Sequence, residues 1–167
     1  MMDFGADTRF TLLYPDLPAA ALAWAQAADR ALSQVEFLQD IRLEGDLLSG
    51  QLRVPVPLLG DITLPFCSCL ERRAHGAALT PQVLVGRRGW VEVRGLAEVG
   101  PAQEDGTPVT LDFDFRAHLS LPQSGNRGGA AFEKMVRATA QRTTERVLAQ
   151  LPEQLHRSMS PAPPSAP

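Results

Sequence analysis

The segment that decides the fold of this chain is VTLDFDFRAHLSL, which runs from Val109 to Leu121. Apolar and polar residues alternate through it without interruption. Successive side chains of a β-strand point to opposite faces, so one face of this strand is apolar and the other is polar. The pattern therefore predicts a long strand of an antiparallel sheet, with one face buried against a second layer. The apolar face consists of Val109, Leu111, Phe113, Phe115, Ala117, Leu119 and Leu121.

Alternation with a period of two also precedes this segment, and turn residues divide it into strands. Gly45-Asp46 predicts a tight hairpin, and Gly60-Asp61 predicts a second turn. Pro55 and Pro57 cannot donate to a sheet ladder, so their strand is expected to lie at an edge or bulge. The strands predicted before the last one are Thr8–Tyr14, Leu38–Glu44, Leu47–Leu58, Ile62–Arg72, Ala77–Val85 and Trp90–Val99.

Helical periodicity occurs in two places. Ala19 to Leu32 is rich in alanine, follows a possible N-cap at Asp16, and precedes a short turn over Gln34 to Leu38. A second helix is predicted from Ala130 to Leu155, about 40 Å long at ~1.5 Å per residue. Pro152 is expected to end or bend it. Its apolar stripe contains Phe132, Met135, Val136, Thr139, Ala140, Thr143, Val147, Leu148 and Leu151.

This order of elements predicts an α+β domain, because the long helix alone is large and apolar enough to cover the sheet. The 167 residues suit one domain over residues 1–157, followed by a disordered Pro/Ser/Ala tail over residues 158–167. A net charge of −3 gives no general attraction to nucleic acid or anionic membranes. The chain shows no secretory signal and no apolar run of membrane-spanning length, so a cytoplasmic location is expected.

Two further stretches resemble a known family. Gly106-Thr-Pro-Val-Thr-Leu-Asp-Phe-Asp-Phe resembles the entry into the last strand of the START-like (helix-grip, SRPBCC) superfamily, and Gly128-Gly-Ala-Ala-Phe-Glu-Lys-Met-Val resembles the start of its gripping helix. The resemblance covers about residues 8–155. It implies a bent seven-stranded antiparallel sheet wrapped around the C-terminal helix, with a cavity between them. The superfamily includes lipid carriers, aromatic cyclases, plant hormone receptors and many bacterial members of unassigned function.

The expected function is therefore the binding of a small apolar molecule, such as a lipid or quinone, without a cofactor or metal. A filled core with no ligand stays open as an alternative. So does a cyclase or dehydratase, which needs inward polar groups; Tyr14, Glu92 and Arg94 are the ambiguous ones. A third alternative is an interaction module that dimerises through Val54–Leu58. The predicted ligand-binding residues are Leu64, Phe66, Val91, Val93, Phe113, Phe115, Phe132, Met135, Val136 and Thr139.

Three polar groupings have both a chemical and a structural interpretation. Asp112, Asp114, Arg116 and His118 form a row that fits either an acid/base pair or a wet sheet surface. Arg87-Arg88 beside Trp90 fits a nucleic-acid or acidic head-group site, or simply an exposed turn. Cys67 and Cys69 lack the further ligands of a zinc site, which favours simple packing. The chain contains no Ser-His-Asp order, phosphate-binding glycine loop or HExxH motif.

Overall fold

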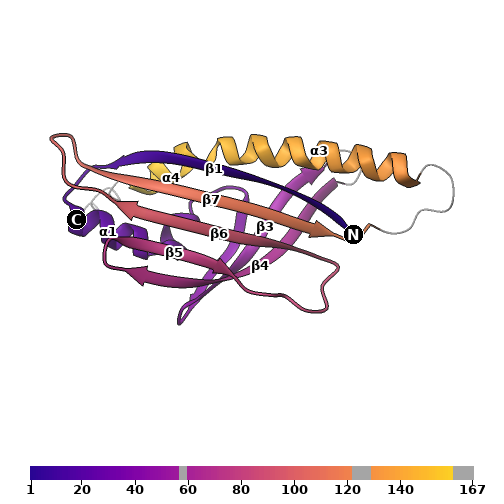
Figure 1. Cartoon of the computed structure of the whole chain (residues 1–167), viewed down its shortest axis with the longest axis horizontal. Coiled ribbons are helices and arrows are strands. Elements are labelled where there is room, and N and C mark those ends of the chain that lie inside the picture. Colours follow the sequence, from indigo (N-terminus) through magenta and orange to yellow (C-terminus); the bar gives the residue numbers. More distant parts are fainter. Residues whose placement is uncertain (57–59, 122–128, 160–167) are drawn as a thin grey trace, which may run out of the picture.

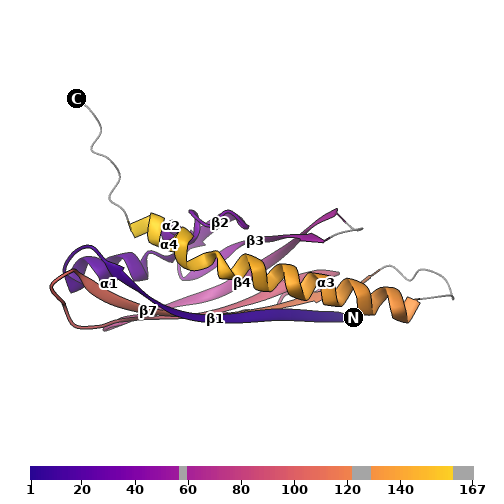
Figure 2. The ribbon, with the colours of Figure 1, turned by 90° about the horizontal axis from the view of Figure 1, so that it is seen from above.

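A computed structural model describes residues 1–56, 60–121 and 129–159. Within these residues the chain forms four helices and one antiparallel sheet of seven strands, and the helices lie on one side of the sheet (Figures 1 and 2). The spatial order is β1-β7-β6-β5-β4-β3-β2, so the predicted fold class is confirmed. The strands are β1 (Met2–Tyr14), β2 (Leu38–Glu44), β3 (Leu47–Val56), β4 (Gly60–Arg73), β5 (Gly76–Pro81), β6 (Gly89–Val99) and β7 (Thr107–Leu119).

The first strand is longer than predicted. β1 begins at Met2, not at Thr8, and pairs with β7 from Met2↔Leu119 to Tyr14↔Thr107. Met2 and Phe4 are buried in the core. The alternation near Gly5 is too weak to predict a strand, but β7 offers this segment a ladder of backbone partners along its whole length. Strand β5 is shorter than predicted: it ends at Pro81, and residues 82–88 form an exposed connection to β6.

The long helix α3 (Gly129–Ala149) lies along the concave side of the sheet, beside β1 (Figures 1 and 2). Its buried stripe is narrower than predicted and consists of Val136, Ala140, Thr144 and Leu148, each four residues from the next. Met135 is 46% exposed, which contradicts the prediction that it faces the sheet. The Thr139 hydroxyl donates to the Met135 carbonyl in its own helix. Side chains four residues apart form a ridge along a helix, and helices commonly pack such ridges into grooves of the surface they meet. The buried residues of α3 form a ridge of this kind.

Pro152 breaks the C-terminal helix, as predicted. Helix α3 ends at Ala149, and α4 (Leu151–Met159) begins after the single residue Gln150, with Pro152 as its second residue. Proline is tolerated there because the first turn of a helix has no intrahelical N–H partner. Ser158 and Met159 belong to α4 and not to the predicted tail; residues 160–167 of that tail lie outside the described residues.

The alanine-rich segment forms two helices where one was predicted. Helix α1 (Pro18–Gln26) and α2 (Ala28–Leu32) are separated by Ala27, whose backbone is not helical. The N-cap is Leu17, not Asp16; the Asp16 carboxylate instead accepts a hydrogen bond from the Leu17 N–H. Residues 33–37 form turns where a short helical turn was expected. The break lets α1 and α2 both direct buried alanines toward one apolar space beside the sheet.

Pro55 lies in β3 where the sheet permits a proline. The pairing of β2 with β3 begins at Leu38↔Leu52, so β3 has no neighbour on that side at Pro55. The predicted hairpin at Gly45-Asp46 is confirmed by the pair Glu44↔Leu47. Pro57 lies outside the described residues. Of the helices described, none is long and apolar enough to cross a membrane.

A side chain of α3 caps one point on the β1 edge of the sheet. β1 is an edge strand, and Gln141 of α3 meets its backbone at Gly5. The Gln141 Oε1 accepts from the Gly5 N–H at 3.0 Å, and its Nε2 donates to the Gly5 carbonyl. A Cβ at residue 5 would lie 2.2 Å from the Phe115 carbonyl oxygen, so only glycine fits. The amide thus replaces a neighbouring strand at this point.

The closeness of α3 to the sheet predicts the effect of a larger side chain. Ala140 is fully buried, so Ala140→Leu is expected to lower the free energy of unfolding by about 1–3 kcal/mol through overpacking. The matched control is Ala138→Leu on the exposed side of α3, which should change stability by less than about 0.5 kcal/mol. Urea denaturation of both variants tests this, and equal stability of the two would refute close packing at Ala140.

The Gln141 contact predicts local protection of β1. Gln141→Ala should destabilise the protein by about 1–2 kcal/mol, because two backbone groups of Gly5 lose their partner. It should also speed amide hydrogen exchange at Gly5 more than at the central strands. Arg142→Ala, at the next and exposed position of α3, is the control. Unchanged exchange at Gly5 in Gln141→Ala would contradict the edge-capping role.

Candidate functional site

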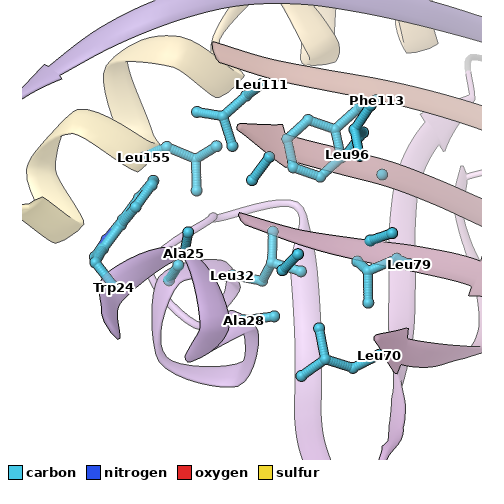
Figure 3. Close-up of a pocket in the computed structure, with 15 residues that line it drawn as sticks. Trp24, Ala25, Ala28, Leu32, Leu70, Leu79, Leu96, Leu111, Phe113 and Leu155 are labelled. Carbon is cyan, nitrogen blue, oxygen red and sulfur yellow. The ribbon is translucent and has the colours of Figure 1, made fainter. Parts of the chain in front are cut away.

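An apolar cavity lies under α1 and α2, at the end of the sheet where α4 also packs. Figure 3 shows side chains from these helices pointing toward side chains of the strands across it. Leu155 of α4 closes one side, and Phe113 of β7 belongs to the opposite wall. The lining consists of Trp24, Ala25, Ala28, Ala31, Leu32, Leu70, Ala77, Ala78, Leu79, Gly95, Leu96, Ala97, Leu111, Phe113 and Leu155.

The cavity is small. Its volume is about 40 Å³, room for roughly three water molecules at ~10–15 Å³ each. Drug-sized ligands occupy pockets of roughly 300–1,000 Å³. The limiting side chains are larger residues such as Leu32 and Leu79, whereas much of the rest of the wall is alanine. In this conformation the space holds at most a few atoms of a ligand, and a larger ligand requires the helices to move away from the sheet.

The predicted ligand-binding residues are mostly placed elsewhere. Of them, only Phe113 lines this cavity. Leu64, Phe66, Val91, Val93, Phe115 and Val136 are buried in the close-packed core, and Phe132 is partly buried against it. The contacts of Phe115 with Phe37 and Phe113, at centroid distances of 6.4 and 6.2 Å, show how aromatic rings fill that region. The other lining residues were not among the predicted ones; they include the alanines of α1 and α2, which the sequence signals only by their abundance.

The cavity offers little acid–base chemistry. None of its described lining residues is ionisable. Arg94 is exposed, and Glu92 lies on the outer face of the sheet, where it contacts His118. Tyr14 packs on Trp24 with ring centroids 6.0 Å apart and does not line the cavity. The four buried polar side chains of the described chain all have hydrogen-bond partners; they are Ser68, Thr107, Thr144 and Gln154.

The charged row of β7 lies on the outer face of the sheet, and three of its members, Asp114, Arg116 and His118, contact charged neighbours. Arg116 contacts Asp114 at 3.3 Å. His118 contacts the Asp3 carboxylate through Nδ1 at 2.7 Å and the Glu92 carboxylate through Nε2 at 3.1 Å. Its ring also stacks on Trp90 at a centroid distance of 4.8 Å. This cluster joins β1, β7 and β6, and it fits the expected wet surface.

The surroundings of His118 change its protonation. Partial burial lowers the pKa of His118, but hydrogen bonds to Glu92 and Asp3 and their negative charges together outweigh burial, so the pKa is raised.

On the same outer face, Cys67 and Cys69 are free and half-buried. Burial, and secondarily the neighbouring Cys69, raises the pKa of the Cys67 thiol, which disfavours the reactive thiolate. Among the described residues no His, Cys, Asp and Glu group could hold a metal ion.

The raised pKa predicts a pH-dependent stability. Protonated His118 stabilises the folded state fully below its ordinary pKa of about 6.5, and this contribution is lost as the pH rises through the raised value. The stability advantage of the wild type over His118→Gln should therefore shrink between about pH 5.5 and about pH 9 in urea denaturation. Asp3→Asn should weaken the same dependence. An advantage that stays constant with pH would refute the ion-pair role.

Comparisons with known proteins agree with this fold. The zhui aromatase/cyclase from Streptomyces sp. R1128 superposes with a TM-score of 0.53 and 14% identity, over 92% of this chain and 93% of that one. The di-domain ARO/CYC StfQ from the steffimycin biosynthetic pathway gives a TM-score of 0.51 and 13% identity, over 93% of this chain and 49% of that one. Identities this low show a shared fold and carry no assignment of activity.

These similarities confirm the helix-grip resemblance at the level of the fold. No curated protein matches the chain. The family model described as "Protein of unknown function (DUF3809)" matches residues 9–149, most of the described domain. The protein therefore belongs to the DUF3809 family, and its architecture is the helix-grip fold.

Proposed function

We propose that this protein binds a small apolar molecule in the cavity under α1 and α2, without catalysing a reaction on it. The observation that carries this proposal is the character of the wall: it is lined by apolar side chains from three helices and four strands, and small alanines leave the space open. Binding sites for apolar molecules are concave and mainly hydrophobic. An enzyme of the cyclase or dehydratase type would need ionisable groups directed inward, and the described lining supplies none.

The small volume limits how binding takes place. Because about 40 Å³ does not admit a lipid or quinone, the ligand must displace α1 and α2 from the sheet. These helices are suited to such movement: α1 and α2 are short, they are separated at Ala27, and neither has a side-chain N-cap. Elements with few stabilising contacts open at low free-energy cost. Large side chains of the lining, such as Leu79 and Phe113, would then contact the ligand.

A cavity-filling substitution tests the proposal. Ala77→Val adds two methyl groups to the β5 wall, and valine suits a strand. The wild type should bind the neutral fluorescent probe N-phenyl-1-naphthylamine saturably at one site, and Ala77→Val should weaken that binding at least about tenfold, which corresponds to about 1.4 kcal/mol. Thermal unfolding should show that the variant is folded.

The control is Thr80→Val, an exposed position of the same strand that does not line the cavity. It should leave probe binding unchanged. Absence of saturable binding to the wild type, or equal binding to wild type and Ala77→Val, would overturn the proposal. Native mass spectrometry of gently purified protein gives a second readout, in which a retained small molecule is expected and should be lost from Ala77→Val.

A further inference from the structure

The connection between β5 and β6 exposes an apolar surface. Val83 and Val85 are 85% and 88% exposed, the two highest values among the large hydrophobic residues described. Figure 1 shows this connection projecting beyond β5, at the end of the molecule where the N-terminus lies. Isolated exposed apolar residues are common on protein surfaces. Two such valines at the tip of one loop, on either side of half-buried Leu84, form a continuous apolar tip.

Basic residues follow this tip directly. Arg87 and Arg88 are exposed, and the segment Gln82–Trp90 contains no Asp or Glu, although the whole chain has a net charge of −3. The loop therefore carries a local positive charge opposite in sign to the rest of the protein. Apolar side chains lie at the outer point of the loop, and the arginines follow them. This order matches the depth profile of a bilayer surface, in which the hydrocarbon boundary lies beneath the phosphates.

The base of the loop is fixed on both sides, so the tip projects and does not fold back on the core. The Gln82 N–H donates to the Cys67 carbonyl at 2.8 Å, and the Ser120 N–H donates to the Arg88 carbonyl at 2.8 Å. Trp90 is held at the start of β6 by its stack on His118. Gly86, with a φ of 76°, turns the chain between the valines and the arginines.

We infer that residues 82–88 are a docking surface for an anionic phospholipid bilayer. The valines would enter the head-group boundary while Arg87 and Arg88 contact lipid phosphates. Charge complementarity favours this partner over nucleic acid, for which the exposed valines have no use. None of residues 82–88 lines the cavity under α1 and α2, so membrane docking does not depend on the proposed ligand binding.

Vesicle flotation with the full chain tests the inference. The wild type should float with vesicles of phosphatidylcholine and phosphatidylglycerol at low ionic strength, and much less with phosphatidylcholine alone. The double substitution Arg87→Gln/Arg88→Gln should weaken the partition coefficient by about 25-fold, at roughly fivefold per arginine near an anionic surface. Val83→Ser/Val85→Ser should also reduce binding, and this loss should persist when the salt concentration is raised.

Two double variants provide matched controls. Arg142→Gln/Arg146→Gln removes the same charge from the exposed side of α3. Leu13→Ser/Leu17→Ser removes exposed apolar side chains near the opposite end of the sheet. Both should bind vesicles like the wild type, and circular dichroism should show every variant folded. No flotation of the wild type, equal binding to both vesicle types, or equal loss in the controls would overturn the inference. Light scattering that shows dimers abolished by Val83→Ser/Val85→Ser would assign the surface to a second copy instead and likewise overturn it.

Discussion

The close packing of α3 against the concave sheet is the contact on which the rest of the structure depends. The buried ridge of α3 is narrow, and the residues at the middle of this ridge are small: Ala140 and Thr144 lie between Val136 and Leu148. Thr144 adds no unsatisfied polar group, because its hydroxyl donates to the Ala140 carbonyl at 2.7 Å. Small residues let the helix axis approach the sheet, and the large side chains of the strands, such as Phe66 and Phe115, then fill the space on either side.

Helix α3 packs closely against the middle of the concave face. The cavity therefore lies at the end of the sheet that α1, α2 and α4 cover. Pro152 makes this arrangement possible, since the break after Ala149 redirects the chain and places Leu155 in the cavity wall. The alanines of α1 and α2 cover that space without filling it. The proposed ligand binding therefore depends on the short helices and not on the long one.

The outer face of the sheet has a different role from the inner one. Asp3, His118 and Glu92 link three adjacent strands through a histidine that is protonated more readily than usual. The cluster supports the start of β1 and, through Trp90, the beginning of β6. Gln141 supports β1 from the opposite side. The start of β1, which the sequence did not predict, thus has side-chain contacts from both the outer face and α3.

Local alternation, turn residues and proline sterics were sufficient to predict the order of strands and helical segments along the chain, the polar outer face of β7, the hairpin at Gly45-Asp46 and the break at Pro152. The beginning of β1, the exposure of Met135 and the position of the cavity became visible only in the folded structure. The physical reason is that these features depend on which surfaces meet and how closely. The helical periodicity of Phe132, Met135 and Thr139 indicates an apolar side, but the small residues at Ala140 and Thr144 set the rotation that buries only part of it.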